Sequence, residues 1–495
     1  MRILLLVPPF HEDGLEMSTK ESIGVCYLAA VLRNDGFEVD ILDADLLKLD
    51  ARGTVEMVRR VDYDLIGFSV LEGTIESSVE ILEGLRAEGV GAHVVWGGYF
   101  PTLLAEEILQ RVPGADSVIM GEGEAALLDL ARRLDEGKDW NLLDGLVARD
   151  GDSVRFNAPR KAPRLDDIPF PSRDLLPEVT RRGGVVGIVG SRGCFASCSF
   201  CCIDAFNEAA ALPKWRGRSP ENIIREIQAL REQWDVRMVS FYDSNFIGPG
   251  EAGKRRAYEI GERIKEEGGG VRFAVSTRPD QIDEELFRAL KAAGLVEVFI
   301  GIESMSQKSL DLYRKRTTVQ QNRNALEILE KLEIRYRPGF ILYEPHLTLE
   351  QIRENIEYLH VLINSRFCEK YHFFKGLRPY RGSPMEKMLS EDGTLFRNGW
   401  RNGYRWRDPA VERFIRLTGS IGVKMLPALE KANRLEPADR DDVQRLLGKW
   451  SIDLHEEVLD VIASGQEDAS RFIDIAVKAD KRLARIERSF DLCRA

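Results

Sequence analysis

The chain has 495 residues, of which 44% are hydrophobic and 31% charged, a composition typical of a globular protein with two or three domains. Its formal net charge of −11 argues against a nucleic-acid partner, because phosphates favour a basic surface. No apolar run has the length of a membrane span, and the apolar start lacks the cleavage site of a signal peptide, so we expect a cytoplasmic protein.

The first part of the chain, residues 1–140, alternates between apolar strands and helical segments. This alternation predicts a parallel sheet covered on both faces, in a doubly wound, Rossmann-like arrangement. In such sheets ligands bind beyond the carboxyl ends of the strands. The predicted strands are Ile3–Val7, Val39–Leu42, Asp64–Val70, His93–Trp96 and Ser117–Met120, and the loops at this edge are 8–21, 69–74, 97–102 and 121–124.

Residues 141–182 are predicted to be a linker with a hairpin, because two strand-like runs flank Asp150-Gly151-Asp152 and prolines interrupt the remainder. Residues 183–390 alternate again between strands and helices. This pattern predicts a partial (β/α)6 TIM-like barrel, in which catalytic groups follow the carboxyl ends of the strands. The predicted strands are Val185–Val189, Met238–Tyr242, Phe273–Ser276, Glu297–Gly301, Tyr336–Leu342 and Tyr371–Lys375.

Residues 391–495 are rich in charged residues and leucine at helical spacing, and predict a helical C-terminal domain. We expect its aromatic residues to belong to the core rather than to close over a site. They include Trp400, Tyr404, Trp406 and Trp450. The predicted fold class is therefore α/β, with a Rossmann-like domain, a partial barrel and a helical domain in this order.

Four of the seven cysteines lie within nine positions, at Cys194, Cys198, Cys201 and Cys202. An odd, crowded set indicates a metal site in a reducing compartment rather than a disulfide framework. The spacing C-x3-C-x2-C lets one loop supply three thiolates to an iron–sulfur cluster and leaves one iron open. The alternative is a zinc site, but no histidine lies within 90 residues to complete it. Cys202 could complete it, but adjacent cysteines rarely reach one metal, so we expect Cys202 to serve packing.

The cysteine spacing and its place after the first barrel strand resemble the radical S-adenosylmethionine (SAM) superfamily. The resemblance implies that Cys194, Cys198 and Cys201 hold a 4Fe–4S cluster, which cleaves SAM to a 5′-deoxyadenosyl radical. The segments that follow the next strands are similar to that family's SAM-binding pattern. In this reading Asp243 meets the methionine amino group, Arg278 pairs with the methionine carboxylate, and the segment Glu303-Ser304 contacts the ribose.

Each of these positions also has an ordinary explanation. Asp243 could cap a helix, Arg278 could form a surface ion pair, and Glu303 could be a loop carboxylate. The segment after the fifth strand departs from the family's usual form, so that His346 either faces a substrate or lies on the surface. The segment 378–384 resembles the family's closing loop.

Several N-terminal segments, in order, resemble the cobalamin-binding domain found ahead of radical SAM domains in one class of methyltransferases. The histidine motif Asp-x-His-x-x-Gly is absent, which implies cobalamin without a histidine lower ligand. The alternative is a Rossmann domain that binds nothing or another nucleotide, although Gly-x-Gly-x-x-Gly is also absent. The resemblance implies cobalamin contacts at Pro8, Pro9, Ser69, Leu71, Glu72, Gly73, Thr74, Gly97, Gly98, Tyr99, Gly121, Glu122 and Gly123.

Taken together, the resemblances imply a radical SAM enzyme that abstracts a substrate hydrogen and transfers a methyl group from methylcobalamin to an unactivated carbon. One alternative uses the same cofactors for a rearrangement, cyclisation or oxidation. Another is a cobalamin-binding sensor or scaffold without catalysis. The expected partners are a small-molecule or peptide substrate and an electron donor such as flavodoxin or ferredoxin, with no nucleic acid and no membrane.

Overall fold

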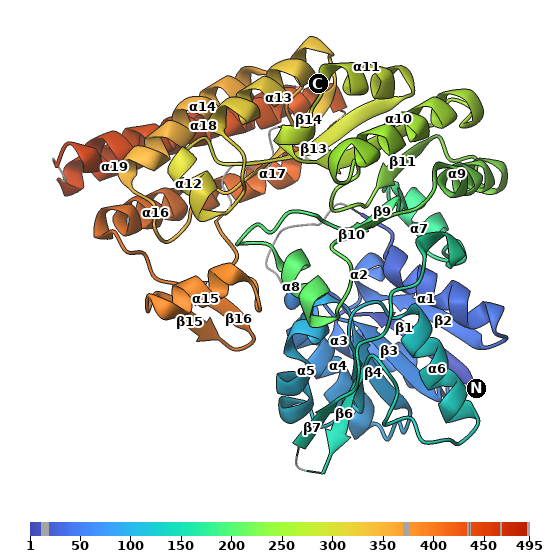
Figure 1. The fold of residues 1–495 in the computed structure, drawn as a ribbon. Helices are drawn as coiled ribbons and strands as arrows, with labels where there is room; N and C mark the ends of the chain where they lie inside the picture. Colours follow the sequence, from blue (N-terminus) through green and yellow to red (C-terminus); the bar gives the residue numbers. More distant parts are fainter. Residues whose placement is uncertain are drawn as a thin grey trace.

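The computed structural model describes residues 1–10, 19–151, 153–369, 376–432, 435, 437–465 and 468–492. Three parts follow one another along the chain, and Figure 1 shows them as a lower α/β domain, an upper α/β domain and a set of long helices. The predicted strand Tyr371–Lys375 and the residues His11 and Cys493 lie outside the described residues. Among the described helices, none is long and apolar enough to cross a membrane.

The N-terminal domain is built on a sheet with the order β2-β1-β3-β4-β5-β6-β7. Its first five strands in sequence are parallel, in the order 2-1-3-4-5 of flavodoxin-like doubly wound sheets. The strands are β1 Arg2–Val7, β2 Glu38–Asp43, β3 Leu65–Ser69, β4 His93–Gly97, β5 Ser117–Ile119, β6 Leu146–Asp150 and β7 Ser153–Phe156. The helices are α1 Ile23–Asn34, α2 Ala44–Leu47, α3 Ala51–Val58, η1 Glu72–Thr74, α4 Ile75–Ala87, α5 Tyr99–Arg111 and α6 Glu124–Asp135.

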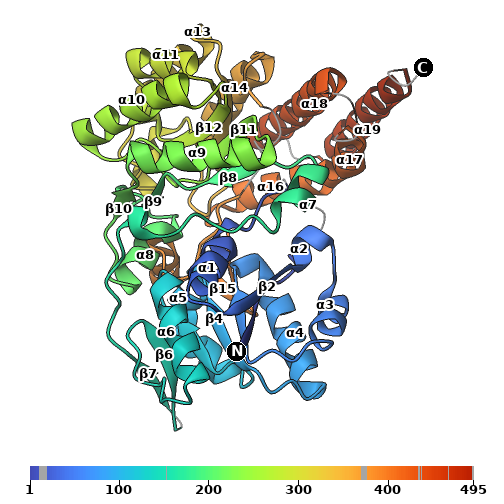
Figure 2. The ribbon, with the colours of Figure 1, turned by 90° about the vertical axis from the view of Figure 1, so that its right-hand side faces the viewer.

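The apolar strands are buried on both faces, as the sequence predicts. Alternate residues of β1 point to opposite faces, so that Leu4 and Leu6 join one apolar core while Ile3 and Leu5 join another. Helices cover both faces of the sheet (Figure 2). The carboxyl ends of the five parallel strands therefore form one edge at which the predicted cofactor loops gather.

The hairpin β6–β7 belongs to the N-terminal sheet rather than to a free linker. Strand β6 pairs antiparallel with β5 and places Ala148 opposite Ser117. Without it, β5 would be an edge strand with unpaired backbone groups. The segment that crosses to the second domain follows β7 and contains η2 Leu165–Asp167 and α7 Leu176–Arg181.

The second domain has an open, fully parallel sheet in the order β14-β13-β12-β11-β8, a partial barrel as predicted. A separate two-stranded ribbon, β9–β10, flanks the cysteine loop. The strands are β8 Val186–Ile188, β9 Ser191–Gly193, β10 Trp215–Gly217, β11 Met238–Phe241, β12 Arg272–Thr277, β13 Leu295–Glu303 and β14 Arg335–Phe340. The helices are α8 Cys202–Ala209, α9 Pro220–Trp234, α10 Gly250–Glu267, η3 Pro279–Gln281, α11 Glu284–Ala292, α12 Gln307–Leu312, α13 Val319–Lys331 and α14 Leu349–Asn364.

The C-terminal part is mostly helical, but a hairpin precedes its long helices, which the sequence did not predict. The elements are α15 Pro384–Glu391, β15 Leu395–Asn398, β16 Arg401–Tyr404, α16 Pro409–Gly422, η4 Val423–Met425, α17 Leu426–Ala432, α18 Pro437–Ala463 and α19 Ala469–Leu492. Trp450 is buried between α18 and α19, where its Nε1 donates a hydrogen bond to the carbonyl of Ala479 over 2.8 Å. The core interpretation of this tryptophan is therefore correct.

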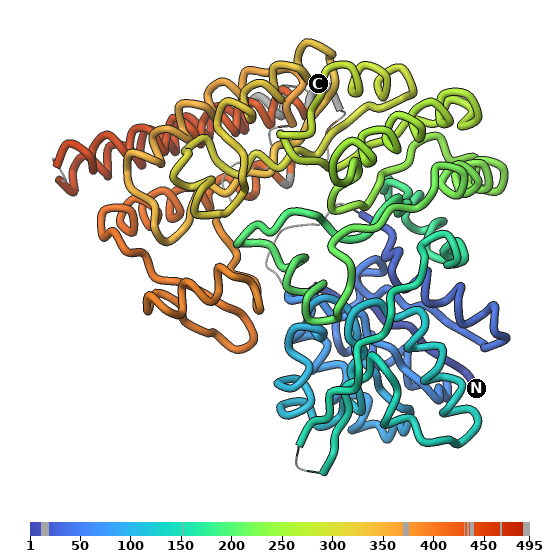
Figure 3. The backbone as a smooth tube through the Cα atoms, viewed as in Figure 1, coloured from blue at the N-terminus to red at the C-terminus, as the bar shows by residue number. Residues whose placement is uncertain are grey.

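The hairpin β15–β16 returns to the N-terminal domain, as the tube in Figure 3 shows for this orange segment. Trp400 lies in the turn of this hairpin and is buried in the apolar core of the N-terminal domain. The guanidinium of Arg111 lies over it, 3.7 Å from the ring centroid. Ion pairs join Arg401 to Glu76 at 3.2 Å and Arg381 to Glu107 at 2.6 Å. The C-terminal part of the chain is thus attached to the N-terminal domain.

Candidate functional site

The cysteine loop packs directly on the carboxyl edge of the N-terminal sheet. Helix α8, which starts at Cys202, lies beside α5 in both Figure 1 and Figure 2. The rings of Phe206 and Tyr99 lie 4.4 Å apart, centroid to centroid. A Cβ on Gly121 would come within 2.6 Å of the Cβ of Ala210. The loop that carries the cysteines therefore faces the loops predicted to hold cobalamin.

The backbone of the cysteine loop is held by hydrogen bonds around Ser199. Its amide donates to the carbonyl of Tyr313 over 2.8 Å, and its hydroxyl donates to the carbonyl of Leu312 over 2.8 Å. Its carbonyl accepts from the amide of Met385, again over 2.8 Å. Phe200 packs edge-on against the buried ring of Tyr313. The loop is therefore a fixed structure rather than a free one.

The three predicted ligands are free thiols, of which Cys198 is buried and Cys194 and Cys201 are half-buried. Burial raises the pKa of Cys194 and raises that of Cys201 to about 12, although the amides of Ala196 and Ile203 face the sulfurs and oppose this. Such thiols become thiolates when a cation binds. Three thiols on one loop, two of them with backbone donors, fit an iron–sulfur cluster.

Among the residues that the structure describes, no three side chains of His, Cys, Asp or Glu surround a single metal-ion position. An iron–sulfur cluster does not need such a position, because each thiolate binds a different iron.

Arg278 lies beside the cysteine loop, where Nη1 is 3.7 Å from Sγ of Cys198. Its guanidinium is buried, and it donates from Nη2 to the carbonyl of Lys315 over 2.7 Å and from Nε to the carboxylate of Asp280 over 2.9 Å. The surface-pair explanation is therefore wrong for Arg278. The structure places a fixed positive charge next to the thiols, where an anionic ligand group would be stabilised.

Glu303 ends β13 in a left-handed conformation, with φ of 62°, which is costly for a residue with a side chain. Its Oε1 accepts a hydrogen bond from Nζ of Lys315 over 2.9 Å, and Lys315 is only 5% exposed. A Cβ on Gly301 would come within 2.7 Å of both Oε1 and Nζ. A side chain at position 301 would therefore displace the carboxylate or the ammonium group of this ion pair from its present position. Ser304 points inward instead, where its hydroxyl donates to Asn355 over 3.0 Å.

Lys315 was not predicted from the sequence. It lies in the run Arg314-Lys315-Arg316, which reads as a solvated basic turn, and both of its neighbours are indeed exposed. Nothing in the local sequence distinguishes the one buried cation of this run. Its position becomes apparent only when the turn packs against β13.

Asp243 is 3% exposed and supports the entrance to the cysteine loop. Its two carboxylate oxygens accept from the amide of Gly190 and from the hydroxyl of Ser191, each over 2.7 Å. Burial raises the pKa of Asp243, against the effect of the Ser191 hydroxyl and of Arg256. Asp243 does not cap α10, which begins at Gly250. It holds the strand β9 that leads into the cysteines.

The predicted cobalamin loops lie along one edge of the N-terminal sheet. Leu71 is 39% exposed, and its amide donates to the hydroxyl of Thr74, which starts the turn Glu72–Thr74. Ser77 donates to the carbonyl of Pro9 and holds the Pro8-Pro9 segment in place. A Cβ on Gly97 would meet no atom within 4 Å. This open backbone beside an exposed leucine fits the approach of a flat, largely apolar macrocycle.

The other glycines of this edge face protein instead. A Cβ on Gly98, which has φ of 110°, would come within 2.9 Å of the carbonyl of Val70. A Cβ on Gly123 would come within 3.1 Å of Leu28. The carboxylate of Glu122 is bound to Arg192 and Arg216 of the second domain. These positions are therefore occupied by contacts within the chain.

His346 is half-buried, and its Nε2 lies 2.7 Å from the carboxylate of Asp392, with Glu344 on its other side. These carboxylates raise the pKa of His346. It is neither a free surface residue nor an open substrate contact.

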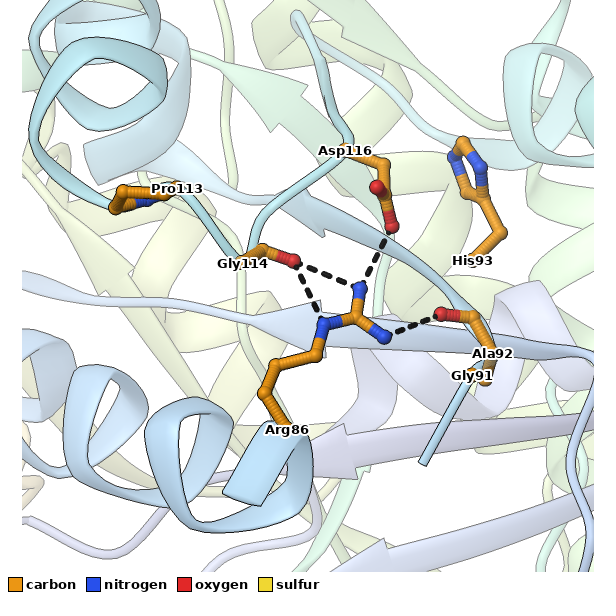
Figure 4. A pocket seen from close by; sticks show the side chains of 7 residues that line it. All are labelled: Arg86, Gly91, Ala92, His93, Pro113, Gly114 and Asp116. Atoms are coloured by element: carbon orange, nitrogen blue, oxygen red, sulfur yellow. Dashed lines mark hydrogen bonds and ion pairs between the residues drawn. The ribbon is translucent and has the colours of Figure 1, made fainter. Parts of the chain in front are cut away.

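A shallow depression at the opposite edge of the N-terminal sheet lies away from all these groups (Figure 4). The guanidinium of Arg86 fills it and donates to the carbonyls of Gly114 and Ala92 and to Asp116. His93 bonds to Ser117 over 2.9 Å, and burial lowers the pKa of His93 to about 4. All of these groups serve the fold.

Comparison with protein families gives two matches. Residues 19–131 match the B12 binding domain, and residues 188–359 match the Radical SAM superfamily. The chain combines a B12-binding domain with a radical SAM domain. The predicted family and fold class are thereby confirmed, and the chain is a radical SAM enzyme.

Among curated proteins, an uncharacterised methyltransferase of Pyrococcus horikoshii is 28% identical over 419 residues, which cover 83% of this chain and 88% of the relative. Among solved structures, the cobalamin-dependent SAM radical enzyme OxsB with aqua-cobalamin and SAM bound has a TM-score of 0.80 at 18% identity, covering 99% of this chain and 80% of that one.

The radical SAM methyltransferase TsrM from Kitasatospora setae, with cobalamin and a 4Fe–4S cluster bound, has a TM-score of 0.69 at 19% identity, covering 94% of this chain and 99% of that one. The predicted cofactor set agrees with the two domain types and with the cofactors named for these neighbours of the same fold.

Proposed function

We propose that this radical SAM enzyme is a cobalamin-dependent methyltransferase that adds a methyl group to an unactivated carbon of a natural-product or metabolite intermediate. The observation that carries the proposal is the packing of helix α8, which directly continues the cysteine loop, on the cobalamin edge, through Phe206 against Tyr99 and Ala210 close to Gly121. A substrate between the two domains would lie next to both cofactors. The methyltransferase name of the relative that matches most of the chain supports methyl transfer.

We assign Cys194, Cys198 and Cys201 to a 4Fe–4S cluster, and Arg278 and Glu303 to direct contacts with SAM. Asp243 and Ser304 would act indirectly, because their side chains are engaged by Gly190, Ser191 and Asn355. When bound, the cofactors supply a 5′-deoxyadenosyl radical that abstracts a substrate hydrogen and a methyl group that replaces it. The chain's own residues position these groups, and the ion pair with Lys315 fixes the direction of the Glu303 carboxylate.

We assign the cobalamin to the carboxyl edge of the N-terminal sheet, with the exposed Leu71 and the open Gly97 beside the corrin. The substrate would be a small molecule or a peptide, and a flavodoxin or ferredoxin would supply electrons. We place the reaction in the cytoplasm, because the thiols of the cysteine loop are unpaired and must stay reduced.

The test is anaerobic incubation of the full-length protein with cobalamin, a reductant, methyl-labelled SAM and a cell extract, followed by mass analysis of labelled products. A product heavier by one labelled CH2, formed together with 5′-deoxyadenosine, supports the proposal. Formation of 5′-deoxyadenosine with an unlabelled product would support the rearrangement alternative instead. A protein with a complete cluster that never cleaves SAM would support the sensor alternative.

A further inference from the structure

The acidic loop of the B12-binding domain is held by the radical SAM domain on both sides of the cysteines. This loop, residues 121–124, follows β5 at the carboxyl edge of the sheet. Strand β9 contacts it just before the cysteine loop, and the end of α8 and then strand β10 contact it after that loop. The chain therefore enters and leaves the cysteine loop at one site on the other domain.

Two arginines of the ribbon bind two glutamates: Arg192 on β9, before the cysteines, and Arg216 on β10, after α8. Nη2 of Arg192 donates to Oε1 of Glu124 over 2.5 Å, and Nη1 of Arg192 lies 3.2 Å from Oε2 of Glu122. Arg216 faces Arg192 across the ribbon and binds the other oxygen of Glu122. The guanidinium of Arg192 also lies 5.3 Å from the ring centroid of Tyr27. We call these four charged residues the interdomain ion-pair cluster.

After the cysteines, the contact is made by apolar side chains that pack closely on Gly121. Gly121 has φ of 78°, and a Cβ there would come within 2.6 Å of Ala210 and 3.5 Å of Leu212. The amide of Gly121 is also fixed, because it donates a hydrogen bond to the hydroxyl of Thr102 over 2.9 Å. Glycine at this position lets α8 approach the acidic loop as closely as backbone allows.

Glu124 is held in its ionised form by its partner in the ion-pair cluster. Burial acts to raise the pKa of Glu124, but the Arg192 guanidinium beside it holds that pKa below its usual value. A buried ion pair adds little net stability compared with apolar packing, but it is directional. Arginine that binds two carboxylates fixes both angle and distance. Such an arrangement fixes the relative position of the two domains more than it stabilises their association.

The ion pairs fix the position of Cys194, the first of the three proposed ligands of the iron–sulfur cluster. Arg192 lies two residues before Cys194, and β9 ends at Gly193, where a Cβ would come within 2.1 Å of the carbonyl of Lys214. One residue, Gly193, separates Arg192 from Cys194, and it is closely packed against the backbone of Lys214. A radical reaction requires the reacting atoms to lie close together. A displacement of about 1 Å at this point would therefore lower the reaction rate.

We propose that Glu122, Glu124, Arg192 and Arg216 are positioning residues that set the distance between the cysteine loop and the cobalamin edge. The inference rests on the proposed function, because it assumes both cofactors. It gives Glu122 a role in holding the second domain rather than in contacting the corrin. The four residues would hold the cysteine loop in register with the cobalamin edge while substrate and product exchange.

The test uses the two cofactors of the full-length protein as spin probes. Cob(II)alamin and the reduced cluster are both paramagnetic, so microwave power saturation of the cob(II)alamin signal reports their separation. The double variant Glu122→Gln/Glu124→Gln should lose the relaxation enhancement of wild type while it retains iron and cobalamin. The exchange Arg192→Glu/Glu124→Arg should restore part of it. Asp129→Asn, which removes an ion pair with Arg160 from the same helix α6, is the matched control and should change nothing.

An unchanged enhancement in the double variant would overturn the inference and leave the proposed function intact. Loss of cobalamin binding in that variant, with the cluster retained, would overturn it in favour of a direct contact with cobalamin. If the double variant does not fold, Arg192→Lys keeps the charge without the fork, and full enhancement in it would also overturn the inference. A wild-type protein that binds no cobalamin would overturn the proposed function and the inference together.

Discussion

The three cysteines of the predicted site differ from Cys202 in their place on the chain. Cys194, Cys198 and Cys201 belong to the loop between β9 and α8, whereas Cys202 is the first residue of α8. Burial raises the pKa of Cys202 to about 11, and the negative charge of Glu72 adds to this. The place of Cys202 on the helix, outside the loop, agrees with the packing role expected for it.

Replacement of Cys198 by serine should therefore abolish cluster assembly, because a cluster held by three thiolates loses a third of its protein ligands. Iron and sulfide content after anaerobic reconstitution measures this directly. Cys202→Ser is the matched control and should retain the iron content of wild type. Equal loss of iron in the two variants would show that Cys202 is a ligand.

Glu21 is a buried carboxylate at the junction of the domains, where it binds Arg173. Burial raises the pKa of Glu21 from 4.5 to about 7, although Arg173 opposes the shift. The folded state therefore binds a proton that the unfolded state releases between these two values. The contribution of Glu21 to stability is complete below pH 4.5 and is lost as the pH rises to about 7.

Glu21→Gln should remove this part of the pH dependence, since the amide is neutral at every pH. The melting temperature of the cofactor-free variant, relative to wild type, should rise progressively across this window. A difference that does not vary with pH would show that Glu21 is ionised throughout.

Lys315 is the cation that neutralises Glu303 in the interior. Lys315→Met keeps the length of the side chain but leaves the carboxylate buried and unpaired. Breaking a buried pair in this way costs about 3–5 kcal/mol, so the free energy of unfolding should fall by this amount. SAM binding, measured by equilibrium dialysis, should weaken as well. Arg316→Met, one residue away on an exposed side chain, should change neither quantity.

At the scale of elements, the hairpin β15–β16 joins the last part of the chain to the first. Trp400 is 7% exposed and belongs to the core of the N-terminal domain. Trp400→Ala should lower the free energy of unfolding by about 3–5 kcal/mol, as expected for a buried tryptophan. Phe396, on the same hairpin but 43% exposed, provides the control. Equal effects of Phe396→Ala and Trp400→Ala would show that the hairpin does not dock in solution.

The strands that could be predicted included those with continuous apolar runs, such as Ile3–Val7, because both faces of a parallel sheet are buried. The hairpin around Gly151 was also predicted from its turn residues, but its pairing with β5 was not, since pairing depends on contacts far apart in the sequence. The packing of Trp400 in the N-terminal domain could not be predicted for the same reason, since its partners lie nearly three hundred residues earlier.

In the candidate site, Cys194, Cys198 and Cys201 could be predicted as ligands from their spacing, because a short loop can be judged locally. The side-chain partners of Glu122 and Glu303 could not be identified, because Arg192, Arg216 and Lys315 reach them only through tertiary packing. Local sequence predicts which residue types gather at strand ends. It does not predict which of their charges are already paired within the chain.

At the scale of the whole molecule, the N-terminal domain is covered by the rest of the chain at two separate places. The cysteine loop and α8 cover its carboxyl edge, and the hairpin β15–β16 covers α4 and α5. A fragment of residues 1–182 should therefore bind an apolar dye strongly and melt below the full-length protein. Addition of a fragment of residues 183–495 should reverse both effects. A fragment 1–182 as stable as the full chain would contradict this account.

The burial of Trp400 in the first domain has a consequence for biosynthesis. A nascent chain emerges from the ribosome N-terminus first, so the first domain is complete long before residue 400 is made. During that interval the place of the tryptophan ring is empty, and Arg111 has no indole beneath it. We expect the newly made domain to remain incompletely packed until the hairpin arrives. Slow translation between residues 182 and 404 would prolong that exposure, and chaperone binding to ribosome-bound chains should be greatest in this window.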